Sequence, residues 1–210
     1  MTPKEAIEKL TAKFGETIAQ PVEFRGEHTV AVAREKIADV CAFLKRDCTF
    51  DVLTDLSGVD NYGDDPRFEV VYHLYSLTHH CSLRLKVRVS EDDPIVDSVT
   101  GVWRTADWHE REAFDMFGIR FRNHPNLKRI LMWEGYPYFP LRKDFPLAGQ
   151  QAELPETAVN AGRVEAAPML GGPFVPAIGT RSSVVREPRQ VDTVVENIDR
   201  VKHPTKKEQV

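Results

Sequence analysis

The sequence predicts an α+β fold in which N-terminal helices pack on a mostly antiparallel sheet, with an extended C-terminal arm. Apolar residues recur at helical spacing in the first 45 residues. From Phe50 the spacing changes to two, as in strands separated by short turns. Residues 148–210 hold six prolines and one aromatic residue, so they could not form a core of their own. We therefore expect one α+β domain over residues 1–147 and an arm over residues 148–210 that wraps a partner.

The composition excludes several classes of protein. A chain of 210 residues with 41% hydrophobic content can bury one sizeable core. Its 28 basic and 32 acidic residues give a net charge of −4, which argues against binding nucleic acid. No apolar run reaches the roughly 20 residues that a membrane span needs. The first residues include acids, so we expect no signal or transit peptide, and any membrane association should come through a partner.

The first predicted element is an amphipathic helix over residues 3–15. Thr2 and Glu5 have the spacing of a capping box, and Pro3 suits the first helical position. Next, residues 22–25 and 29–32 flank Gly26 and indicate a short hairpin. A second helix is expected over residues 35–45. Its buried face should comprise Ile37, Val40, Cys41 and Leu44, so we interpret Cys41 as a core residue.

The predicted strands follow. Val52, Leu53 and Leu56 should lead into a turn over residues 58–66, which are rich in turn residues. Residues 68–75 are apolar on both faces, as in a central strand, and the turn 76–80 should join them to strand 83–89 in a hairpin. A short strand is expected over residues 95–99. Strand 83–89 alternates apolar residues with Arg84, Lys86 and Arg88, which form either a binding stripe or, as we favour, a solvated sheet face.

A short helix ending at Gly118 is unusual in its charges. Asp107, Arg111 and Asp115 are four residues apart and should form a charge ladder on one face. Glu110 falls on a face that is otherwise apolar, which is costly unless a cation or a backbone donor meets it. Asp107 and Glu110 also have the spacing of a capping box, and Gly118 suits the positive φ that ends a helix.

Several motifs of fixed spacing run from this helix to residue 147. They are Glu110-Arg111-Glu112, Asp115-Met116-Phe117, His124, Lys128-Arg129-Ile130-Leu131 and the segment from Pro140 to Leu147, which includes Arg142 and Asp144. Together they closely resemble the signature of the thirty-kilodalton subunit family of respiratory complex I, the NADH-quinone oxidoreductase of bacteria. The resemblance is strong over residues 50–147.

The resemblance implies a cofactor-free structural subunit in the peripheral arm of a proton-translocating NADH:quinone oxidoreductase, on the cytoplasmic side of the bacterial membrane. The expected partners are the large quinone-site subunit and neighbouring iron–sulfur subunits, with FMN and the clusters held by partner chains. The chain's own cysteines, Cys41, Cys48 and Cys81, are fewer than the four thiolates that a cluster usually takes. The implied interface residues are Glu110, Arg111, Glu112, Asp115, Phe117, His124, Lys128, Arg142 and Asp144.

Three alternatives remain open on the sequence. The same family resemblance fits the equivalent subunit of a membrane-bound hydrogenase or of an F420H2-oxidising complex. A free-standing metal-dependent hydrolase could use His109, Glu112 and His124. Glu110, Arg111 and Glu112 could also act as acid, cation and base in an active site, although an ion-pair network that fixes the helix explains them more simply. The wider set of candidate metal ligands comprises His79, His80, Cys81, His109, Glu110, Glu112 and His124.

Overall fold

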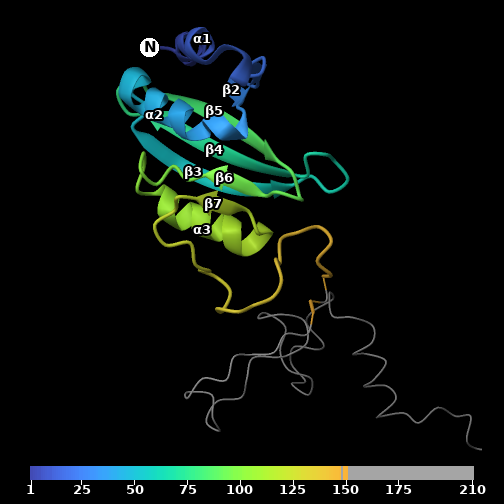
Figure 1. Cartoon of the computed structure of the whole chain (residues 1–210). Coiled ribbons are helices and arrows are strands. Elements are labelled where there is room, and N and C mark those ends of the chain that lie inside the picture. The colour runs from blue at the N-terminus through green and yellow to red at the C-terminus, as the bar shows by residue number, and fades with distance from the viewer. Residues whose placement is uncertain (148, 151–210) are drawn as a thin grey trace, which may run out of the picture. The chain divides into compact units, whose positions relative to one another are not determined.

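The computed structural model describes residues 1–147, 149 and 150, so the predicted arm lies almost entirely outside the described residues. A five-stranded sheet has the order β1-β2-β5-β4-β3 and a two-stranded sheet pairs β6 with β7. All pairings in the larger sheet are antiparallel except β2 with β5. Helices and a mostly antiparallel sheet confirm the predicted α+β class (Figure 1).

The first helix, α1, runs from Pro3 to Phe14. Its capping box is formed as predicted: the Thr2 hydroxyl accepts the Glu5 N–H and the Glu5 carboxylate accepts the Thr2 N–H, both at 3.3 Å. Ala6, Ile7 and Leu10 are buried along one stripe. A short 3-10 turn, Gly15–Thr17, follows the helix.

The predicted hairpin is also confirmed. Strand β1 (Val22–Phe24) pairs with β2 (Glu27–Ala31) across Arg25 and Gly26, whose φ angles are 51° and 80°. Two successive residues with positive φ match the twist that a tight hairpin needs. β2 then pairs in parallel with β5, which allows the hairpin to extend the sheet at one edge.

The second helix, α2 (Ile37–Cys48), follows a 3-10 turn at Arg34–Lys36 and lies across one face of the sheet (Figure 1). It begins two residues after the predicted start at residue 35 and continues three residues beyond the predicted end at residue 45, where Cys48 is buried. Cys41 is fully buried, which confirms it as a core residue.

Strand β3 (Val52–Asp60) is longer than predicted, and placing Gly58 in a turn was wrong. The glycine serves close packing instead: a Cβ built on Gly58 would lie 2.6 Å from Cδ2 of Phe117. Such a close approach of a side chain to a strand is a recognised reason for glycine within it. The turn proper occupies the residues between β3 and β4 (Phe68–Ser76), and β4 is central, as predicted.

Strand β5 has one apolar face and one basic face, as predicted. β5 (Cys81–Val89) directs Leu83, Leu85, Val87 and Val89 into the core. Its basic residues meet acids of the same chain: Arg84 pairs with Glu27, and Lys86 and Arg88 both contact Glu69, at 2.7 and 3.3 Å. The basic stripe is therefore locally compensated, which favours a solvated sheet face.

The remaining elements form the two-stranded sheet and a third helix. β6 (Ile95–Asp97) pairs in parallel with β7 (Arg120–Arg122), and α3 (Ala106–Phe117) packs against β3 (Figure 1). One compact unit comprises Met1–Trp133 with Leu141–Lys143, and the described part of a second unit comprises Glu134–Pro140 and residues 144–147. The described residues include no helix long and apolar enough to cross a membrane. The domain boundary after residue 147 stays a prediction.

Candidate functional site

The signature helix α3 begins at Ala106, one residue before Asp107, which the sequence predicted as its N-cap. Its N-cap is Thr105, which makes no side-chain capping bond and instead donates to the Leu53 carbonyl at 3.3 Å. Asp107 lies within the first turn, so the predicted Asp107–Glu110 capping box was wrong. Glu110 cannot serve such a box because its side chain points into the protein interior.

Glu110 is fully buried, as its place on the apolar face predicts. Its Oε1 accepts the Val99 N–H at 2.7 Å, which is the backbone donor that such a buried carboxyl requires. Burial raises the pKa of Glu110 to about 7, partly offset by hydrogen bonds from the Ser98 hydroxyl and the Val99 amide. The side chain thus ties α3 to the segment after β6.

Arg111 does not form the predicted charge ladder with Asp107 and Asp115. Its Nε and Nη2 donate to the carbonyls of Lys128 and Arg129, at 3.1 and 3.3 Å. Its guanidinium also lies 5.2 Å from the ring centroid of Trp108. Loop carbonyls with no helix or strand partner compete for the guanidinium, which explains why helical spacing alone misassigned its partners.

Asp115 is fully buried and holds the same loop. Its Oδ2 accepts the main-chain N–H groups of Ile130, Leu131 and Met132, at 3.0, 2.7 and 2.8 Å. Its Oδ1 pairs with Arg129 at 2.5 Å. A carboxylate that meets three backbone donors and a guanidinium has its charge fully compensated inside the chain.

His124 closes the loop at its other end, and its side chain is fully buried. Nδ1 accepts the Asn126 N–H at 3.0 Å, and Nε2 lies 3.2 Å from the Asp107 carbonyl oxygen. The imidazole therefore bridges α3 and the turn at residues 124–126. This role is structural.

The closing motif is tied back to the sheet in the same way. Asp60 Oδ2 accepts the Lys143 N–H at 2.7 Å and contacts Arg67 Nη2 at 2.8 Å. Hydrogen bonds from Arg67 hold the pKa of Asp60 below its ordinary value. Arg142 Nε donates to the Phe117 carbonyl at 2.7 Å, at the end of α3. Sequence reasoning missed Asp60 and Arg67, although an acid and a base flanking a turn are a signal for such a pair.

The nine predicted interface residues divide into two groups. Glu110, Asp115 and Phe117 are buried, and Arg111, His124 and Arg142 bond to main-chain groups of the same chain. Glu112, Lys128 and Asp144 have exposed side chains, Asp144 in the second unit. The signature residues that the structure brings together are therefore mainly those that fix the loop after α3 to the helix.

The candidate metal ligands are not brought together. Among the described residues no three His, Cys, Asp or Glu side chains are placed to hold a metal ion. His109 Nδ1 lies 3.5 Å from Asp55 instead, Glu112 is exposed, and His124 is directed at Asp107. The geometry gives no support to the hydrolase that would use these three residues.

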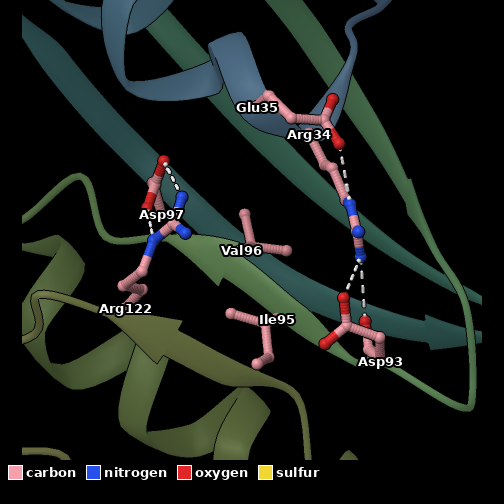
Figure 2. Close-up of a pocket in the computed structure, with 7 residues that line it drawn as sticks. All are labelled: Arg34, Glu35, Asp93, Ile95, Val96, Asp97 and Arg122. Carbon is pink, nitrogen blue, oxygen red and sulfur yellow. Dashed lines mark hydrogen bonds and ion pairs between the residues drawn. The ribbon is translucent and has the colours of Figure 1, made fainter.

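A small hollow lies between the 3-10 turn before α2 and the two-stranded sheet (Figure 2). Its volume is about 120 Å³, and its floor includes Ile95 and Val96. Two ion pairs border it: Arg34 with Asp93 at 2.9 Å and Arg122 with Asp97 at 2.6 Å. Both guanidinium groups already have acidic partners, so the hollow is a poor site for an anionic ligand.

The chain is similar in sequence to known proteins over its described part. Residues 30–151 match the family model described as the respiratory-chain NADH dehydrogenase 30 kDa subunit. The chain is 54% identical over 144 residues to an NADH-quinone oxidoreductase subunit of Rhizobium etli (strain CIAT 652), covering 68% of this chain and 76% of the relative. It is 49% identical over 148 residues to the corresponding subunit of Geotalea uraniireducens (strain Rf4), covering 70% and 90%.

Two solved structures share the fold. The trypsin-resistant fragment (1–134) of Nqo5 is 33% identical with a TM-score of 0.53, covering 60% of this chain and all of the fragment. A chain of the archaeal membrane-bound sulfane sulfur reductase has a TM-score of 0.58, covering 68% of this chain and 84% of that one. At 22% identity the second likeness concerns the fold alone.

Proposed function

Because the chain belongs to the respiratory-chain NADH dehydrogenase 30 kDa subunit family, we propose that it is the cofactor-free structural 30 kDa subunit of a proton-translocating NADH:quinone oxidoreductase. In this role it sits in the peripheral arm on the cytoplasmic side of the membrane. It docks the large quinone-site subunit and the neighbouring iron–sulfur subunits. FMN and the clusters are held by those partner chains, and electrons pass through them to the quinone.

One observation carries the structural role: the charged groups of the signature are used inside the chain. The Asp115 carboxylate is occupied by three N–H groups and Arg129, and the Arg111 guanidinium by two carbonyls. Groups compensated in this way have little capacity left to bind a substrate or a cofactor. They fix the shape of a surface instead, and a fixed surface is what docking requires.

The surface that they fix displays two large apolar side chains. Trp108 and Leu131 are each 61% exposed. Trp108 is held under the Arg111 guanidinium, and the main chain of Leu131 is held by Asp115. Rigid, exposed aromatic and aliphatic residues are typical anchors of protein interfaces. Leu131 belongs to the proposed docking edge, which comprises Glu110–Phe117 and the loop to Leu147. We add Trp108, on the first turns of α3, to that edge.

The proposed arm, residues 148–210, adds contact area to a partner. Its apolar stretches at residues 167–176 and 191–201 would be unusual in a segment that remains in water. The solved fragment of Nqo5 was a trypsin-resistant piece, 1–134, that this chain spans in full. A trypsin-resistant fragment with this fold in a similar protein supports a separately folded domain in this chain.

Co-purification from membranes tests the docking edge. Full-length tagged chain is produced in cells that contain the complex, and captured partners are identified by mass spectrometry. Trp108→Ala and Leu131→Ala should each weaken capture of the large quinone-site subunit, because loss of an interface anchor costs about 2 kcal/mol or more. Leu77→Ala is the matched control, since Leu77 is 59% exposed on the β4–β5 turn. Undiminished capture by both variants, with unchanged folding, would contradict the docking edge.

A further inference from the structure

Two carboxyl groups and one imidazole meet beside α3 without forming a metal site. The side chains of Glu110 and His124 are fully buried, whereas that of Asp107 is 38% exposed. Asp107 Oδ1 and Glu110 Oε2 are both buried, and neither has a hydrogen-bond partner among the described residues. They lie 3.1 and 3.9 Å from Nε2 of His124. Buried carboxyl oxygens without a partner are costly, so the position of protons in this cluster matters to its energy.

The ring of His124 has a defined tautomer. A main-chain amide can only donate, so the Asn126 N–H at 3.0 Å requires that Nδ1 carry no proton. The ring hydrogen is therefore on Nε2, and it is donated to the Asp107 carbonyl oxygen at 3.2 Å. Glu110 Oε2, at 3.9 Å from Nε2, is the competing acceptor.

The other elements packed around Glu110 supply no competing charge. Cys41 on α2 and Tyr72 on β4 are the titratable groups that interact with it from those elements. Burial raises the pKa of both groups, so both stay neutral at physiological pH. Asp107, on its own helix, disfavours the charged form of Glu110. Apart from the Ser98 hydroxyl and the Val99 amide, which already donate to Glu110, His124 is the group that can respond when Glu110 loses its proton.

We propose that Asp107, Glu110 and His124 form a proton-sharing cluster, in which ionisation of Glu110 draws the Nε2–H of His124 away from Asp107 and onto Glu110 Oε2. The proton that leaves Glu110 passes to solvent, and the ring hydrogen of His124 stays on Nε2 because Nδ1 accepts the Asn126 N–H. The ring movement shifts the turn at residues 124–126, which leads into the loop held by Asp115. A pKa of about 7 places this change in the neutral range. This movement of the His124 ring takes place in the isolated chain and does not require a docking partner.

Nitrogen NMR of the imidazole rings tests the proposal on the full chain, with His124→Gln used to assign the signals. The Nε2 signal of His124 should move in one step with a midpoint near the pKa of Glu110. Glu110→Gln should abolish the step. Glu112→Gln, which removes an exposed carboxylate on the same helix, should preserve it.

Two outcomes would overturn the proposal: no step in the unmodified chain, or the same step in Glu110→Gln. A second measurement needs no variant and covers the case in which Glu110→Gln does not fold. The infrared band of a protonated carboxylic acid should persist in the folded chain above the pH at which ordinary carboxyl groups are ionised, and disappear in the neutral range. Its absence just below neutral pH would equally overturn the proposal.

Discussion

Asp115 on α3 and Met132 in the following loop are joined by a hydrogen bond of 2.8 Å from the Met132 N–H to the Asp115 carboxylate. Ile130 and Leu131 donate to the same oxygen, so three successive amides converge on it. The sequence gives no indication of this contact, because the two residues are 17 positions apart. The contact explains how a conspicuous acid can be essential to the signature while it lies wholly inside the protein.

Removing this carboxylate should strongly destabilise the domain. Asp115→Ala leaves three N–H groups and the largely buried Arg129 guanidinium without their acceptor, which costs about 3–5 kcal/mol. Glu112→Ala, on the exposed side of the same helix, should change the free energy of unfolding by no more than about 0.5 kcal/mol. Urea unfolding of the two full-length variants measures the difference. Equal stability of the two variants would show that Asp115 does not hold the loop.

The close contact between Gly58 and Phe117 gives a second prediction. Gly58→Ala places a methyl group 2.6 Å from the Phe117 ring, so we expect a loss of about 1–3 kcal/mol. Gly101→Ala is the control, because no atom lies within 4 Å of the position that its added methyl group would occupy. Combining Gly58→Ala with Phe117→Leu should recover part of the loss in thermal unfolding. Additive losses in the double variant would rule out this contact as the cause.

Glu110 should make stability fall as pH rises toward neutrality. Its pKa is about 7 in the folded chain and 4.5 ordinarily, so the folded chain binds the proton more tightly. Between these two pH values Glu110 is ionised in the unfolded chain but protonated in the folded chain. Its contribution to the free energy of unfolding therefore falls by on the order of 3 kcal/mol across this range. Glu110→Gln removes the titration, so its unfolding free energy should decline less over that range. An unchanged decline in urea titrations at several pH values would contradict the assignment.

The local elements of the fold could be predicted from the sequence because their signals are local. The Thr2–Glu5 box, the Arg25–Gly26 turn and the stripe containing Cys41 each depend on residues within one or two turns. The parallel pairing of β2 with β5 could not be predicted, since it joins residues about 55 positions apart. Gly58 was misassigned for a similar reason: its partner, Phe117, lies on another element.

The sequence predicted where the candidate site lies, but not which groups its charged side chains contact. The motif residues identified α3 and its following loop, yet the predicted Asp107–Arg111–Asp115 ladder assumed that neighbours on a helix face pair with each other. Main-chain groups of the loop competed successfully for Arg111 and Asp115. Periodicity describes the faces of one element and carries no information about what a distant loop offers to them.

The central claim is that the signature charges shape a docking surface and take no part in electron transfer. Arg111→Ala tests it most directly in cells that depend on the complex, with the exposed Arg104→Ala as control. The amount of assembled complex and its NADH:quinone turnover per assembled complex are measured separately in membranes. We predict that Arg111→Ala lowers the amount assembled while turnover per complex stays unchanged, and that Arg104→Ala changes neither. A normal amount of complex with lost turnover would contradict the account.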